Sequence, residues 1–210
     1  ADPDANIITF SGVVASNVSM RLNDFNAVIE TRGSTSNGYS SAVQLAEDTS
    51  SLEDVDIAFN NVHVEIGDRG HFAYLFRPVN NPTLKNVRMS WNGGSAVLKA
   101  NDEDLDCIFK VVTTTRSISW NGVAFLFTDA HTLTCNAVSG RGRLLHIEKP
   151  STAPFNNTVV SFSKSVMNFN VPNDSSYIVS INAPTTLFNF TFDQSTFAGV
   201  CNGRAFRFFQ

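Results

Sequence analysis

The chain is poor in charge and has no long apolar run. Only 16% of its 210 residues are charged, the formal net charge is −4, and 42% of the residues are apolar. A coiled coil would need Glu, Lys, Leu and Ala in bulk, and this composition excludes one. The apolar content excludes a disordered acidic chain, and the acidic balance argues against a nucleic-acid binder that relies on a basic field. The apolar runs are too short to span a membrane.

Helix signals are also scarce, and alternating patterns take their place. Segments in which every second residue is apolar are typical of half-buried β-strands. Such segments contain Val18, Met20 and Leu22, then Val62, Val64 and Ile66, then Val87, Met89 and Trp91, then Met167, Phe169 and Val171, then Phe188, Phe190 and Phe192. The polar positions between them carry many of the 22 Asn residues, so the sequence predicts an all-β protein with a polar but weakly charged surface.

A short motif, a small residue followed by an apolar strand, returns along the chain. Its copies are anchored at Ala42, Ala73, Ala96, Ala124, Leu144, Ile178 and Ala205, with a mean interval of about 27 residues. The string Ser90-Trp91-Asn92-Gly93 also returns, as Ser119-Trp120-Asn121-Gly122. Repeats of this length without helices are typical of a solenoid. We expect about seven turns, roughly 34 Å in all at ~4.8 Å per turn, with an antiparallel β-sandwich as the alternative.

The two ends suggest how the chain is organised. Residues 1–3, Ala-Asp-Pro, resemble a scar left by processing of a secretion vector, so they are excluded from fold reasoning. The segment 205–210 is a strand-like apolar run without a polar cap. We therefore expect a single β-solenoid domain over 4–210, excised from a longer ectodomain.

The cysteines predict one disulfide. Cys107 and Cys135 are assigned to equivalent positions in successive turns, 28 residues apart. Stacked parallel strands place such residues about 4.8 Å apart, which is within the range of a disulfide. We predict a Cys107–Cys135 bridge and an unpaired Cys201; the alternative is that the first two are buried free thiols. A disulfide would indicate an oxidising compartment.

Four Asn-x-Ser/Thr acceptors for N-glycosylation occur, at Asn17, Asn156, Asn173 and Asn189. This number is what the composition supplies by chance, so only the placement of the acceptors carries information. Asn17 and Asn189 fall on the polar phase of alternating strands. A glycan at either position would stay outside the core.

The pattern resembles a known fold and a group of surface proteins. The Leu-x-Asn/Cys openings, Ser-Trp-Asn-Gly and the Gly-x-Ala motif resemble a right-handed parallel β-helix of the pectin-lyase-like kind. The turns, rich in Asn, Ser and Phe, also resemble kinetoplastid parasite surface glycoproteins such as the dispersed gene family. The resemblance covers about residues 13–209. It implies a membrane-anchored extracellular protein without assigned catalysis.

The motifs for catalysis and metal binding are incomplete. Asp102, Glu103, Asp104 and Asp106 form the densest acidic cluster, which we place in a solvated turn. The spacing of its Asp residues begins like a calcium loop, but Cys107 stands where that loop needs Gly and Thr113 where it needs Glu. The hydrolase signatures of pectin-lyase-like enzymes are missing. Gly140-Arg141-Gly142-Arg143 is interpreted as a solvated basic turn, and the four His residues lack metal-ligand spacing.

These observations favour a non-enzymatic cell-surface module that presents a rigid, glycosylated face to a protein or glycan partner. No catalytic residue, metal site, cofactor or nucleic-acid partner is predicted. A carbohydrate-binding or polysaccharide-cleaving β-helix is the alternative, and it rests on analogy of fold. A third hypothesis is self-association through the apolar C-terminal end, at Phe206, Phe208 and Phe209.

Overall fold

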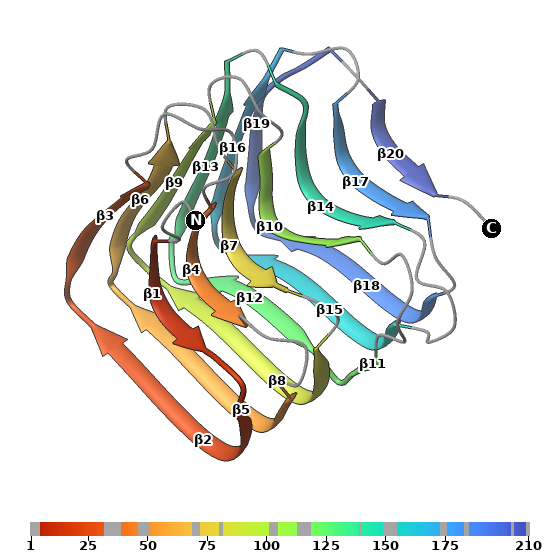
Figure 1. The fold of residues 1–210 in the computed structure, drawn as a ribbon. Coiled ribbons are helices and arrows are strands. Elements are labelled where there is room, and N and C mark those ends of the chain that lie inside the picture. The colour runs from red at the N-terminus through yellow and green to blue at the C-terminus, as the bar shows by residue number, and fades with distance from the viewer. Residues whose placement is uncertain are drawn as a thin grey trace.

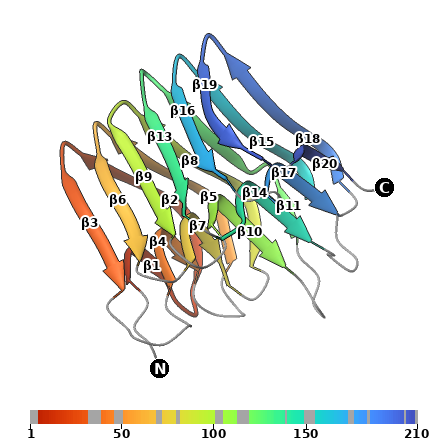
Figure 2. The same cartoon turned by 90° about the horizontal axis from the view of Figure 1, so that it is seen from above.

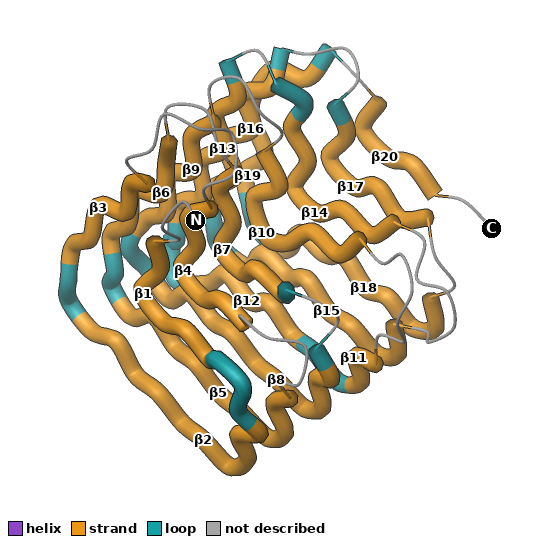
Figure 3. Tube along the Cα trace, viewed as in Figure 1, coloured by secondary structure: helices purple, strands orange, loops and turns teal. Residues whose placement is uncertain are grey.

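The computed structural model describes residues 5–31, 39–45, 51–68, 72–79, 82–100, 105–112, 119–138, 140–148, 155–172, 176–182, 185–202 and 204–208. These residues form strands and short connections without a helix (Figure 3). All strand pairs are parallel, which excludes the antiparallel sandwich. Each pass of the chain adds one level to a right-handed parallel β-helix.

The described strands belong to three sheets. Sheet A contains β1 (Ala5–Phe10), β4 (Tyr39–Leu45), β7 (Phe72–Pro78), β10 (Leu105–Val112), β14 (Gly142–Glu148), β17 (Tyr177–Asn182) and β20 (Arg204–Phe208). Sheet B contains β2 (Val14–Asn23), β5 (Ser51–Asn60), β8 (Thr83–Asn92), β11 (Ser119–Asn121), β12 (Ala124–Thr128), β15 (Phe155–Ser163) and β18 (Thr185–Asp193). Sheet C contains β3 (Asn26–Thr31), β6 (His63–Asp68), β9 (Ser95–Ala100), β13 (Thr132–Ala137), β16 (Val166–Val171) and β19 (Thr196–Cys201).

The chain visits the three sheets in the same order on every coil. β1, β2 and β3 form the first coil, and β4, β5 and β6 stack on them strand by strand (Figure 1). In the fourth coil sheet B holds two short strands, β11 and β12, and both pair with β8 and β15. The described strands make six three-strand coils, and β20 begins the next one. The coils lie side by side along one axis (Figure 2).

Two bends per coil are built from left-handed residues. The first bend lies within the strands of sheet B, and the second joins sheet B to sheet C. The first is formed by Asn17, Asp54, Asn86, Gly122 and Asn157, and the second by Asp24, Asn61, Gly93, Ala130, Lys164 and Gln194, all with positive φ. Asn, Asp and Gly dominate because they reach this conformation at the lowest steric cost.

Hydrogen bonds between equivalent bends give the true repeat of the coil. Asn61 Nδ2 donates to Asp24 Oδ1 over 2.9 Å, with 37 residues between the partners' positions, and Asn86 Nδ2 donates to Asp54 Oδ1 over 2.9 Å, with 32. Ser165 N donates to Ser195 Oγ at a separation of 30 residues. The predicted interval of about 27 residues is therefore too short.

The recurring motif marks strands, and this explains the wrong interval. Ala73 and Leu144 lie in sheet A, whereas Ala96 lies in sheet C and Ala124 in sheet B. Small and apolar residues begin strands in every sheet, so copies from different sheets were counted as successive turns. The Trp motif fails for the same reason. Trp120 pairs with Leu84, and the residue that aligns with Trp91 in the next coil is Phe127.

An aromatic stack runs through the core along sheet B. Successive ring centroids of Phe59, Trp91, Phe127, Phe162 and Phe192 lie 5.3, 4.9, 4.4 and 4.9 Å apart, with nearly parallel planes. Their positions align in the sheet register, so each coil adds one ring. The Phe-rich composition therefore follows from the stacking of the coils.

The predicted disulfide is present, but its placement was predicted wrongly. Cys107 lies in β10 of sheet A and Cys135 in β13 of sheet C, and both strands belong to the same coil. The bond crosses the core, with a Cα–Cα distance of 6.2 Å, instead of joining successive turns. Both cysteines are buried, and Cys201 is a half-buried free cysteine, as predicted.

The glycosylation acceptors occupy different environments. Asn17 and Asn189 are exposed, in agreement with their polar phase. Asn156 is half-buried in β15, where its Nδ2 donates to Asn121 Oδ1 over 3.4 Å. Asn173 lies outside the described residues. Asn17 and Asn189 are thus the acceptors with the fewest steric obstacles to a glycan.

Candidate binding groove on sheet A

The strands of sheet A share a pattern that turns polar side chains away from the core. Two consecutive core residues, such as Leu75-Phe76 in β7 and Leu144-Leu145 in β14, interrupt the strict alternation. The residues on either side of such a pair therefore point outward. This produces two outward columns across the sheet. The first contains Ser41, Tyr74, Asp106, Arg143 and Tyr177, and the second contains Gln44, Arg77, Lys110, His146 and Ser180.

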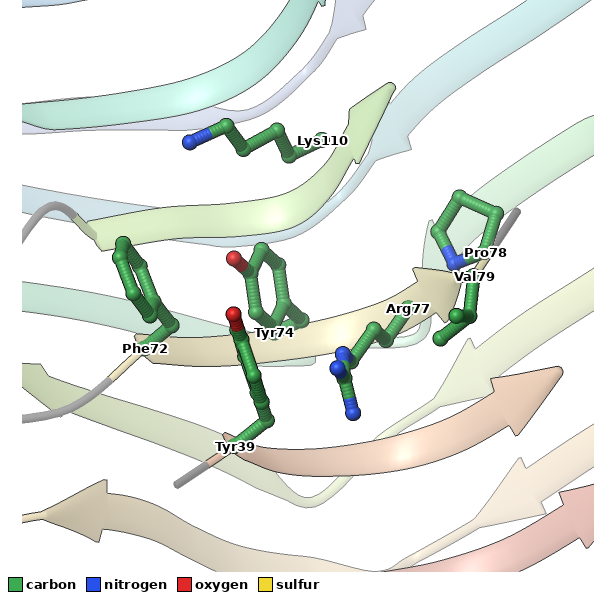
Figure 4. A pocket seen from close by; sticks show the side chains of 7 residues that line it. All are labelled: Tyr39, Phe72, Tyr74, Arg77, Pro78, Val79 and Lys110. Carbon is green, nitrogen blue, oxygen red and sulfur yellow. The ribbon is translucent and has the colours of Figure 1, made fainter. Parts of the chain in front are cut away.

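A groove lies where these columns cross β4, β7 and β10. We call it the sheet A groove; its lining residues are Tyr39, Phe72, Tyr74, Arg77, Pro78, Val79 and Lys110, around a cavity of about 200 Å³ (Figure 4). Tyr39 and Phe72 are register partners on neighbouring strands, so their rings stack with centroids 5.3 Å apart. The Tyr74 ring lies 6.4 Å from each of them.

Two cations pack on these rings. The guanidinium carbon of Arg77 lies 3.5 Å from the centroid of the Tyr39 ring, and Lys110 Nζ lies 5.3 Å from that of Phe72. Both distances are within the range of a cation–π interaction. The flat faces of Tyr39 and Phe72 are thus occupied by each other and by the cations, so the groove presents ring edges, hydroxyl groups and positive charge.

A buried ionic cluster adjoins the groove and corrects two expectations. Asp106 is fully buried in β10, with Oδ1 3.3 Å from Arg143 Nε and 3.8 Å from His146 Nδ1, and with Oδ2 3.7 Å from Lys110 Nζ. The prediction of a solvated acidic turn is wrong for Asp106, because the turn ends one residue before it. Arg143 was assigned to a solvated basic turn and is instead buried, since it pairs in register with Asp106.

The cluster affects the neighbouring phenol. Burial, reinforced by the carboxylate of Asp106, raises the pKa of Tyr74 well above its usual value near 10. Tyr74 is 4% exposed and therefore keeps its proton at neutral pH. Its hydroxyl remains a hydrogen-bond donor toward the groove.

The other residues singled out in the sequence do not join this site. Asp102, Glu103 and Asp104 lie outside the described residues. His63 is exposed on sheet C, where its Nδ1 lies 2.9 Å from Ser95 Oγ, beside a second hollow of about 270 Å³. Within the described ranges, no group of three His, Cys, Asp or Glu side chains could hold a metal ion.

His131 has a structural position. It is buried at the connection between β12 and β13, where its Nδ1 lies 2.7 Å from the Gly93 carbonyl oxygen of the preceding coil. Burial lowers the pKa of His131 to about 4, so the imidazole is neutral at physiological pH and donates its Nδ1 hydrogen to Gly93. This bond ties two coils together.

The groove itself was missed in the sequence analysis. Its residues come from strands about 33 positions apart, and only the coil register brings Tyr39 beside Phe72. The described part of the chain has no helix of the length and apolar character needed to cross a membrane. No protein-family model matches the chain, and neither a curated protein nor a solved structure is significantly similar to it.

Proposed function

We propose that the chain is a non-enzymatic extracellular module of a cell-surface glycoprotein, which presents a rigid face for binding. The observation that carries this proposal is the sheet A groove, a set of aromatic and cationic side chains fixed on three stacked strands. A solenoid suits this role, because each coil positions its neighbours and the faces form extended surfaces. The disulfide is compatible with an oxidising compartment, and the exposed Asn17 and Asn189 support glycosylation.

The absence of catalysis in this proposal rests on the environment of Asp106. A glycosidase needs two carboxyl groups at a defined separation on either side of an accessible bond. Asp106 is the acidic residue closest to the groove among the described side chains, and it is fully buried against Arg143 and Lys110. A carboxylate held by cations in this way is a poor general acid.

The parent protein is proposed to be membrane-anchored, as in the kinetoplastid surface proteins that the sequence resembles. The partner is then a protein or a glycan at a cell surface, without a nucleic acid. The alternative, a carbohydrate-binding or polysaccharide-cleaving β-helix, is favoured by one observation, the aromatic side chains in the groove.

Binding and cleavage can be separated by one experiment on the same ligands. A panel of extracellular polysaccharides is immobilised for surface plasmon resonance and, in parallel, incubated with the protein in a reducing-end assay. We expect retention on at least one ligand without release of reducing ends. Depolymerisation by the wild-type chain that is lost in Asp106→Asn would overturn the non-enzymatic assignment.

A further inference from the structure

The sheet A groove carries an inference about the chemistry of its ligand. Three features of the groove act in the same direction. The faces of Tyr39 and Phe72 are covered, so a neutral sugar ring has no free aromatic face there to stack on. The exposed ring edges carry the positive end of the aromatic quadrupole. The cations Arg77 and Lys110 add full positive charge at two sides of the groove.

Hydrogen-bond donors complete the arrangement. The hydroxyl groups of Tyr39 and Tyr74 lie on the same side of the groove, toward Lys110 (Figure 4). The side chain of Lys110 is 24% exposed and so remains accessible, although it also lies 3.7 Å from Asp106. Among the described side chains that line or touch the groove, three cations, Arg77, Lys110 and Arg143, accompany the single carboxylate of Asp106.

From this geometry we infer that the sheet A groove is an oxyanion site, which takes a tetrahedral sulfate or phosphate group of a ligand. Its donors approach from several directions: Arg77 from beside Tyr39, Lys110 from the next strand, and two phenols between them. A tetrahedral anion offers acceptor oxygens in as many directions, and hydrogen bonds between ionised groups are roughly twice as strong as neutral ones. The inference rests on the proposed binding function and names the ligand chemistry of that same surface.

The test is a titration of the isotope-labelled full chain with sodium sulfate, followed by amide chemical shifts at constant ionic strength. We expect saturable shifts confined to β4, β7 and β10. Lys110→Gln should weaken sulfate binding at least fivefold, and Tyr39→Phe, which keeps the ring stack, should weaken it about twofold to threefold. Lys85→Gln removes an exposed lysine from sheet B and serves as the matched control, with unchanged binding.

Further arms identify the source of the anion. Tighter binding of a sulfated disaccharide than of inorganic sulfate, lost with the desulfated sugar, assigns the site to a sulfated glycan. Equal affinity for inorganic sulfate or phosphate and the sugar ester assigns it to the free ion. Shifts that do not saturate, or equal losses in Lys110→Gln and Lys85→Gln, would overturn the oxyanion site. Retention on a neutral polysaccharide in the binding panel would still leave the proposed function standing.

Discussion

The buried imidazole of His131 makes the fold sensitive to acid. Because the pKa of His131 is about 4 in the folded chain and 6.5 when unperturbed, folding favours the neutral form. This contribution is complete above pH 6.5 and is lost as the pH falls toward 4. We expect the free energy of unfolding to fall by about 3 kcal/mol over this interval through His131 alone.

Denaturant unfolding of the wild-type chain and of His131→Gln at several pH values measures this contribution. The amide of Gln can still donate to Gly93 but does not titrate. The difference in stability between the two proteins should therefore shrink between pH 6.5 and 4. A constant difference over this range would show that His131 does not carry the acid sensitivity.

Adjacent glycines at one bend should respond very differently to substitution. Gly93 and Gly94 both have positive φ, +67° and +69°. A Cβ on Gly94 would lie 2.2 Å from the carbonyl oxygen of Val62, which is backbone of the preceding coil, whereas a Cβ on Gly93 meets its nearest atom at 3.4 Å. Gly94→Ala should lower stability by about 3 kcal/mol or more.

Gly93→Asn is the matched control, because Asn61 forms the same bend one coil earlier. It should cost less than about 1 kcal/mol, since Asn tolerates the left-handed conformation. Thermal and denaturant unfolding of both variants distinguishes the two effects. Similar losses in the two variants would mean that backbone conformation, and not the contact with Val62, limits this bend.

At the scale of the elements, the aromatic stack predicts a gradient of stability along sheet B. Phe127 is stacked between Trp91 and Phe162, whereas Phe192 has a stacked neighbour on one side and is 39% exposed. Phe127→Leu should cost about 1–2 kcal/mol, and the same change at Phe192 under about 0.5 kcal/mol. Equal costs, measured by denaturant unfolding, would contradict a role for stacking beyond burial.

The strands could be predicted from the sequence, but the length of the coil could not. Alternation is a local property, so the segments at Val18 and Val64 were correctly identified as strands. The coil repeat is carried by the left-handed bends, where Asp24, Asn61 and Gly93 satisfy one conformational requirement with three residue types. A search for recurring strings misses this equivalence, because the physical constraint is a positive φ.

The disulfide and the groove show the same limit. The pairing of Cys107 with Cys135 was predicted correctly from an incorrect phase, since residues facing each other across one coil are also within disulfide reach. The groove depends on which strands are neighbours and on the bend after Leu75, and neither follows from local pattern. Once the coil register is known, the stacking of Tyr39 on Phe72 follows directly.

At the scale of the whole molecule, the ends of the solenoid should be less stable than its middle. In a stack of coils, each unit is stabilised mainly by its immediate neighbours, and an end coil has one neighbour instead of two. Val14 in the first coil is 79% exposed and Val200 in the last is 55% exposed, whereas Met89 and Leu98 in the third coil are fully buried. The terminal coils therefore bury less apolar surface and should open more often.

Hydrogen exchange measured by mass spectrometry tests this gradient along the axis. Amides of β8 and β9 should exchange at least tenfold more slowly than those of β2 and β19, although each of these strands is hydrogen-bonded within its sheet. Repeating the measurement at several protein concentrations separates two explanations for protected ends. Protection of β19 that rises with concentration would indicate that a second copy covers the apolar end, as the self-association hypothesis requires. Uniform protection at every concentration would contradict the nearest-neighbour account, because the end coils would then be as stable as the middle without a partner.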